Sequence, residues 1–382
     1  MARTAGSDVV VIGAGIIGSA CAHHLTAAGV EVTVLERAPE PAAGSTGLSV
    51  AGVRVQFSDE VNVRLSWTSI QEYRAFADRY GVDAGYRPIG YLFLVPEAAW
   101  PAHLDGVAVQ RRVGAPVEVV DLLEAQARVA FAADGIAGAT FGPADGVVDP
   151  HSVTHAFLQR ARDGGARVWL DSPVRRAERR GGRWRVEVPG RVVEADHVVN
   201  AAGPWAGEVA RSAGLEVPVA PVRRMVFVTA PVRDAGVLPL TVDVATGFYL
   251  RSEADRVLFG RSRPDEPPGF TTGIDWAWFE QVLGAGVGRF PWLADVGIDM
   301  RASWWGYYEV TPDHNPILGR MPEASGWVNA CGFSGHGVQQ APAVGRVIAE
   351  EIVTGRATTI DIDALRIDRF TRGRGHAERH II

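Results

Sequence analysis

The segment that most constrains the fold is a glycine-rich turn between two apolar stretches near the N-terminus. Residues 8–12 carry mostly β-branched side chains, as expected of a strand that is buried on both faces. A G-x-G-x-x-G pattern over residues 13–18 follows, residues 19–28 predict a helix, and residues 30–35 predict a second strand. This order predicts a βαβ unit of the Rossmann type, which binds a dinucleotide.

Each part of this unit has a physical role. Gly13 permits the tight turn, Gly15 lets the backbone approach a pyrophosphate at the helix N-terminus, and Gly18 lets helix and strand pack closely. Glu36, at the end of the second strand, can accept hydrogen bonds from a ribose hydroxyl and disfavours the 2′-phosphate of NADP. The motif alone does not choose between NAD and FAD. The predicted contacts in this part of the chain are Gly13, Gly15, Ile16, Ile17, Gly18, Glu36 and Arg37.

Composition excludes several other functions. A net charge of -6 argues against nucleic acid as the main partner. All 38 residues in the Lys+Arg count are arginine, so lysine nucleophiles and Schiff bases are excluded, and a substrate carboxylate must be held by arginine, tyrosine or backbone amides. Cys21 and Cys331 lie far apart without metal-ligand spacing, so we predict no metal site and a reducing compartment. Without a clear signal peptide or a long apolar run, we expect no membrane span and a cytoplasmic location.

Three separated segments resemble one flavoprotein family. Residues 44–54 (GSTGLSVAGVR) resemble the flavin-approach loop of the D-amino-acid oxidase superfamily, most of all its sarcosine oxidase and dehydrogenase branch. Residues 200–205 (NAAGPW) and 332–339 (GFSGHGVQ) resemble its NAAG-x-W and G-F-S-G-H-G segments. The resemblance implies FAD as cofactor, with Ser45 and Thr46 at the pyrophosphate. The further contacts that it implies are Val174, Ala202, Gly203, Trp205, Gly332, Gly335, His336, Gly337, Val338 and Gln339.

The third of these segments also has a direct physical use. A glycine-rich loop that leads into a helix exposes unpaired backbone N–H groups, which stabilise negative charge on a reduced flavin. An NAD enzyme has no such need. We expect a helix after residue 337, with Pro342 in its first turn. Whether His336 contacts the flavin or is a structural loop histidine stays open.

The resemblance also implies an α/β fold, α+β overall, in which a Rossmann-type FAD-binding domain is interleaved with a mixed-sheet substrate domain. It places a strand around Val174 near the adenine. The implied domain boundaries are 1–85, 140–215 and 321–382 for FAD binding, and 86–139 and 216–320 for substrate binding.

Amine oxidation at a flavin requires little acid–base chemistry from the protein, because the cofactor accepts the hydride. The protein must position the substrate carbon, keep the amine neutral and exclude water. By resemblance, Tyr249 and Tyr308 face the substrate and Arg54 binds its carboxylate. Arg223 and Arg224 are a second candidate pair for that carboxylate.

The chain departs from its relatives at three positions. Gly306 stands where monomeric sarcosine oxidases attach FAD to a cysteine, so we predict non-covalent FAD. Leu258 and Gln339 stand near positions where those enzymes carry lysines that favour reaction with oxygen, which favours a dehydrogenase that uses another electron acceptor, unless His336 supplies the charge. The expected substrate is a small amine or amino acid of the sarcosine, D-amino acid or cyclic imino acid type. Oxidation of a hydroxy acid or alcohol, and a non-catalytic role in assembly or electron transfer, remain alternatives.

Overall fold

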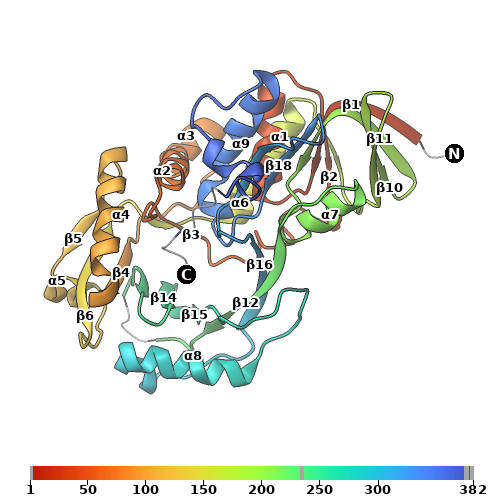
Figure 1. The fold of residues 1–382 in the computed structure, drawn as a ribbon. Coiled ribbons are helices and arrows are strands. Elements are labelled where there is room, and N and C mark those ends of the chain that lie inside the picture. Colours follow the sequence, from red (N-terminus) through yellow and green to blue (C-terminus); the bar gives the residue numbers. More distant parts are fainter. Residues whose placement is uncertain (1–2, 233–235, 374–377, 379–382) are drawn as a thin grey trace.

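The computed structural model describes residues 3–232, 236–373 and 378, and contains two eight-stranded sheets (Figure 1). The first sheet contains β1 (Arg3–Ile12), β2 (Val32–Leu35), β8 (Arg167–Trp169), β9 (Arg176–Arg180), β10 (Arg183–Val188), β11 (Arg191–Asn200), β17 (Ile317–Arg320) and β18 (Trp327–Cys331). The second contains β4 (Tyr91–Pro96), β5 (Glu118–Val120), β6 (Ile136–Gly142), β12 (Ala220–Val228), β13 (Leu240–Asp243), β14 (Phe248–Glu253), β15 (Arg256–Arg261) and β16 (Trp304–Val310). A short ribbon joins β3 (Gly52–Val53) to β7 (Gly146–Val147).

The helices are distributed over both sheets. They are α1 (Ile16–Ala27), α2 (Glu60–Arg74), α3 (Phe76–Tyr80), α4 (Trp100–Val113), α5 (Leu122–Arg128), α6 (Pro150–Asp163), α7 (Ala206–Ser212), α8 (Trp276–Arg289) and α9 (Gly337–Val353). No helix in the described ranges is long and apolar enough to cross a bilayer.

The first sheet is built on parallel strands, as the βαβ pattern predicts. β1 pairs in parallel with β2 on one side and with β11 on the other, and β11 continues to β18. Val9, Val10 and Val11 are fully buried, because helices that include α1, α6 and α9 cover one face and residues of β9, β10 and α7 pack on the other. The expected Rossmann-type fold class is therefore confirmed.

Two local predictions need correction. α1 begins at Ile16 rather than at Ser19, because Gly15 is already its N-cap. Pro342 lies in the second turn of α9, not the first, so the helix lacks one amide donor. The carbonyl of Val338, one turn earlier, instead accepts a hydrogen bond from the Tyr73 hydroxyl of α2. This side-chain donor explains how the helix tolerates an interior proline.

The second sheet lies below the first in Figure 1, with α8 under its outer face. Its core is aromatic, and Phe227, Phe248 and Phe259 pack between the strands and α8. Its strands come from residues 91–142 and 220–310, so β6 runs past the boundary that we placed at residue 140. The division into two domains stays a prediction, and this strand indicates a boundary a few residues later.

Candidate active site

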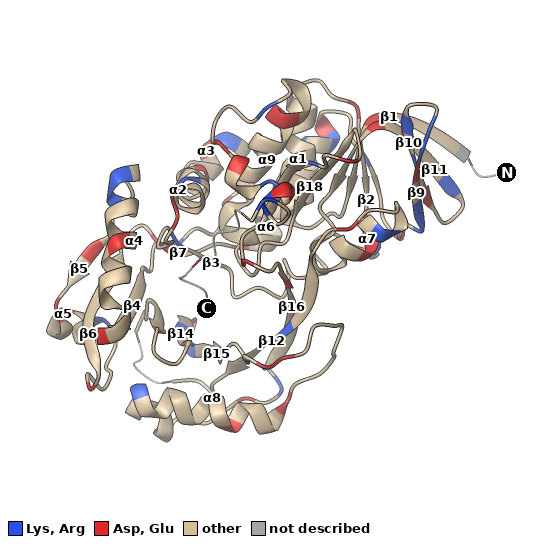
Figure 2. Ribbon diagram, viewed as in Figure 1, with Lys and Arg blue, Asp and Glu red and all other residues tan. Residues whose placement is uncertain are grey.

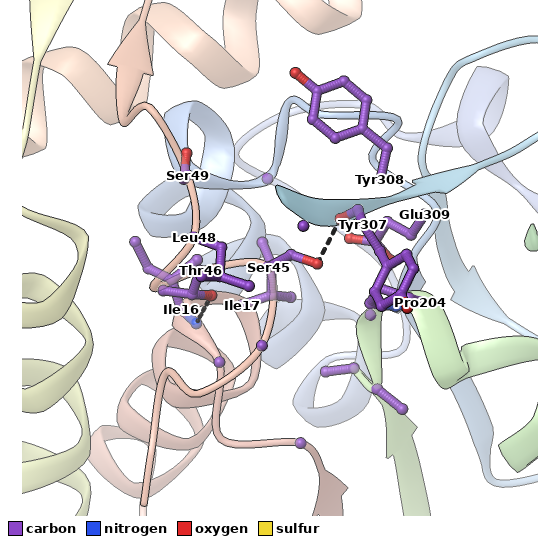
Figure 3. A pocket seen from close by; sticks show the side chains of 18 of the residues that line it. Ile16, Ile17, Ser45, Thr46, Leu48, Ser49, Pro204, Tyr307, Tyr308 and Glu309 are labelled. Carbon is purple, nitrogen blue, oxygen red and sulfur yellow. Dashed lines mark hydrogen bonds between the residues drawn. The ribbon is translucent and has the colours of Figure 1, made fainter. Parts of the chain in front are cut away.

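A cavity of about 730 Å³ lies between the two sheets (Figure 3). Its walls come from the β1–α1 turn, the end of β2, the turn after β11 and the start of α9 on one side, and from β12, β14 and β16 on the other. The predicted site residues that line it are Gly13, Gly15, Ile16, Ile17, Glu36, Arg37, Ser45, Thr46, Arg54, Val174, Ala202, Gly203, Trp205, Tyr249, Tyr308, Gly335, His336, Gly337, Val338 and Gln339.

The glycines of the first turn are required by close backbone packing. Gly13 has a φ of +107°, and a Cβ atom there would lie 2.4 Å from the carbonyl oxygen of Ala201. A Cβ on Gly15 would lie 3.1 Å from the Thr46 hydroxyl, whereas one on Gly18 would meet the Gly13 carbonyl oxygen at 2.0 Å. Gly18 does not line the cavity, and its role is the predicted packing of helix on turn. The turn therefore presents bare backbone at the N-terminus of α1.

Glu36 fixes this turn to the end of β2. Its carboxylate accepts hydrogen bonds from the backbone amides of Ala14 (2.7 Å) and Ala38 (2.8 Å). Because a carboxylate oxygen has two lone pairs, each keeps capacity for a ribose hydroxyl at the cavity wall. Arg37 beside it lies over the ring of Trp205, 4.4 Å from the ring centroid.

The expected strand around Val174 is absent from the described structure, although Val174 itself lines the cavity. β8 ends at Trp169 and β9 begins at Arg176. Pro173 has no amide to give to a ladder, and the amide of Ser172 bonds the carbonyl of Glu36 instead (2.7 Å). The residue is thus placed in a connection that crosses the end of β2.

The loop after β2 is tied to both sheets. The Thr46 hydroxyl accepts a hydrogen bond from the Ile16 amide at 3.1 Å, at the first turn of α1. The neighbouring Ser45 hydroxyl donates to the carbonyl oxygen of Tyr307 in β16 at 2.6 Å, and Figure 3 shows both bonds. Two consecutive side chains therefore join α1, which packs on the first sheet, to β16 of the second sheet at the cavity wall.

The glycine-rich loop before α9 combines supporting and lining residues. Gly332 does not line the cavity; its amide donates to a carboxylate oxygen of Glu309 (2.7 Å), and its φ is +78°. Gly335 does line it, and a Cβ there would meet the ring of Tyr308 at 2.4 Å. His336 is the N-cap of α9, where no side chain caps the first amides.

His336 cannot supply the positive charge considered above. Its side chain is buried edge-on against Phe57, with the ring centroids 4.9 Å apart. Burial, and then the nearby Arg54 guanidinium, lower the pKa of His336 to about 3. The imidazole is therefore neutral near pH 7, and of the two lysine positions, Leu258 lies in β15 away from the cavity wall and Gln339 is uncharged.

Three tyrosines form the far end of the cavity. Tyr249 from β14 and Tyr308 from β16 were predicted, whereas Tyr91 from β4 was missed. Burial raises the pKa of all three hydroxyls, so they remain protonated hydrogen-bond donors. The Tyr91 hydroxyl leaves room only for glycine at position 52, since a Cβ there would lie 1.9 Å from it. Residues 91–95 are apolar throughout, so their sequence does not show which face of the strand meets the cavity.

Two arginines reach this end. Arg54 is 1% exposed, donates to the carbonyl oxygen of Gln56 and lies 4.1 Å from the ring centroid of Phe57. Its segment is anchored by Asp145, which accepts a hydrogen bond from the Val55 amide at 2.9 Å. Arg224 enters from β12 and also lines the cavity, whereas Arg223 does not.

Comparison with known proteins identifies the family. A family model described as FAD dependent oxidoreductase (DAO) matches residues 8–351. The chain belongs to this family. FAD is therefore its cofactor, as predicted, and the cavity fits it, because bare glycine backbone and the N-termini of α1 and α9 line its walls.

Individual relatives cover nearly the whole chain. FAD-dependent oxidoreductase domain-containing protein 1 from Xenopus laevis is 32% identical, over 98% of this chain and 85% of that protein. Human mitochondrial dimethylglycine dehydrogenase is 29% identical over 96% of this chain, which spans 45% of that protein's length. The crystal structure of L-proline dehydrogenase from P. horikoshii superposes with a TM-score of 0.90, at 29% identity, and covers 98% of this chain and 99% of that one.

Proposed function

We propose that the protein oxidises the C–N bond of a small amine or amino acid and passes the electrons to an acceptor other than oxygen. The observation that carries this proposal is the far end of the cavity, where neutral tyrosine hydroxyls and arginine guanidiniums replace an acid–base triad. When bound, FAD supplies the hydride acceptor for such a reaction. The relatives named for dimethylglycine and L-proline oxidation support the same substrate class.

The residues that would hold FAD follow from the cavity walls. Glu36 would receive the ribose hydroxyls, and the N-terminus of α1 with Thr46 would receive the pyrophosphate. The uncapped amides at the start of α9 would stabilise negative charge on the ring system. Gly306, which lines the cavity, has no side chain for a covalent link, so the cofactor is held without one.

At the substrate end of the cavity, the protein orients the substrate and excludes water. Tyr249 is a buried donor and Tyr308 a half-buried one, and their hydroxyls would orient polar groups of the substrate, whereas Arg54 adds a fixed positive charge. Exclusion of water around these groups strengthens each of these interactions. Burial raises the pKa of Glu309, which also lines the cavity, to about 7, so its carboxyl group is fully charged only above neutral pH.

The test is anaerobic titration of the yellow holoprotein with sarcosine, proline and a set of D-amino acids, with bleaching of the flavin absorbance as the readout. Bleaching by one of these amines, and not by lactate or glycerol 3-phosphate, is the expected result. Bleaching only by the hydroxy compounds would replace the proposal with oxidation of a C–O bond. No bleaching by any compound, with FAD tightly bound, would support a non-catalytic flavoprotein.

The identity of the electron acceptor is tested in the same sample, by following reoxidation of the reduced flavin. Neither position that resembles a lysine site of the sarcosine oxidases is charged here, His336 is neutral, and we assign the guanidiniums of Arg54 and Arg224 to the substrate end. We therefore expect the reduced flavin to reoxidise slowly in air and quickly with an artificial electron-accepting dye. Rapid reoxidation in air would make the protein an oxidase. The buried, unpaired Cys21 and Cys331 support a cytoplasmic location, which cell fractionation tests.

A further inference from the structure

The two adjacent arginines of β12 have different surroundings. The Nε of Arg223 donates to the buried carboxylate of Glu266 at 2.8 Å, and its Nη1 donates to the carbonyl oxygens of Thr272 and Gly273 at 3.3 and 2.9 Å. This side chain is therefore committed to holding the segment of residues 266–273. It cannot also bind a ligand in the cavity.

Arg224 points to the opposite face of the strand, because side chains alternate along β12. It lines the cavity, and Figure 2 shows basic residues on β12. Its Nη1 donates to the carbonyl oxygen of Arg223 at 3.0 Å. Its Nε is buried and has no hydrogen-bond partner among the residues that the structure describes.

A buried guanidinium N–H without an acceptor is rare in folded proteins and is costly, so the position calls for a partner from the cavity. The ion pairs of the described ranges include Arg223 but none formed by Arg224. The charge of Arg224 is thus left for a ligand, whereas Arg54 already donates to Gln56 and lies on Phe57.

The neighbours of Arg224 are also suited to an anion. Its guanidinium lies over the ring of Tyr308, 5.1 Å from the centroid, and Tyr308, Tyr249 and Glu266 all favour its charged form. Nε and the adjacent Nη2 form one edge of the guanidinium, which matches the two oxygens of a carboxylate. Desolvation in this wall makes such a charged pair stronger than it would be at the surface.

We propose that Arg224 is the specificity-determining residue that binds the substrate carboxylate, so that the protein selects amino acids over amines that lack a carboxylate. This inference rests on the proposed amine oxidation for its kinetic test. It makes Arg54 a fixed part of the wall that supports the site with a second positive charge, rather than the main carboxylate ligand.

The kinetic test compares an amino acid with its neutral amide, for example proline with prolinamide and sarcosine with sarcosinamide. Loss of a charge-assisted pair predicts that Arg224→Gln lowers kcat/KM for the amino acid by about 10- to 100-fold and leaves the value for the amide within a few-fold. Arg224→Lys should restore part of the loss, since it returns the charge without the fork. Equal losses for amino acid and amide would overturn the inference.

A binding test separates this inference from the proposed function. Acetate is titrated into the oxidised holoprotein, with acetamide as the neutral probe, and the flavin absorbance spectrum reports binding. We expect acetate to bind with a dissociation constant at least about 10-fold weaker in Arg224→Gln than in the wild type. An unchanged acetate affinity would overturn the inference even if amines reduce the flavin. If no amine reduces the flavin, a weakened acetate affinity would still support Arg224 as the anion site.

Arg301→Gln is the matched control, because Arg301 is exposed and lies outside the cavity lining, and it should change neither measurement. If Arg224→Gln proves poorly folded, Arg224→Met keeps the apolar stem and removes the same donors. FAD content and melting temperature equal to the wild type establish that a loss belongs to the site.

Discussion

The buried ion pair between Arg223 and Glu266 allows a quantitative test of what holds the 266–273 segment beside the cavity. Replacing Glu266 with Met removes a carboxylate that is completely buried and leaves the Arg223 charge without a counter-ion. Removal of one partner of such a pair costs about 3–5 kcal/mol in the free energy of unfolding. Phe270 in the same segment stacks on Trp205, which lines the cavity, with ring centroids 5.2 Å apart. Loosening of the 266–273 segment would therefore also disturb the cavity wall.

The expected change in melting temperature follows from chain size. An unfolding entropy of roughly 2.1 cal/mol/K per residue gives about 0.8 kcal/mol/K for a chain of this length, so the variant should melt about 4–6 °C lower. Differential scanning calorimetry of the holoprotein measures this shift. The double variant Arg223→Met, Glu266→Met should recover part of it, because it removes both charges together. A melting temperature within 1 °C of wild type for the single variant, or no recovery in the double variant, would refute this account of the segment.

Three other changes have defined outcomes. Glu36→Leu should weaken FAD binding by about 10- to 100-fold in a fluorescence-quenching titration, because it removes the acceptor for both the ribose and the Ala14 amide; unchanged affinity would contradict the role of Glu36. Burial raises the pKa of Asp145 from 3.8 to about 7, so its contribution to stability is complete below pH 3.8 and is lost as the pH rises through about 7. Asp145→Asn should therefore flatten the fall in melting temperature between pH 5 and pH 8, at most about 1.4 kcal/mol per pH unit, and an unaltered profile would exclude this group as its origin. Tyr249→Phe should slow anaerobic flavin reduction by about 10-fold with FAD affinity unchanged, and a wild-type reduction rate would remove Tyr249 from the site.

Most of the cofactor side of the site could be predicted, because backbone geometry there leaves few alternatives. Gly13 must adopt a positive φ beside Ala201, and no other residue type fits. The helix start was predicted three residues late, since the pattern of side chains cannot show that Gly15 is already an N-cap. The residue Val174 was placed at the cavity but in the wrong kind of segment, because Pro173 excludes a ladder there.

The substrate side was harder to predict because it is assembled from strands that are distant in the sequence. Tyr91 joins Tyr249 only when β4 and β14 flank β13 in the second sheet, and no local pattern encodes that pairing. Arg223 and Arg224 are chemically identical neighbours, and only the partner of each side chain distinguishes them. Sequence reasoning could name the pair but not choose between its members.

The adjacent hydroxyls of Ser45 and Thr46 have a consequence for how events at one end of the molecule are felt at the other. The Ser45 hydroxyl is bonded to β16 and the Thr46 hydroxyl to the first turn of α1, so this dipeptide connects the two walls of the cavity. A small rotation of the second sheet would pull on the N-terminus of α1, where we propose that the pyrophosphate binds. A displacement of β16 would therefore be transmitted to the first turn of α1 through two adjacent side chains.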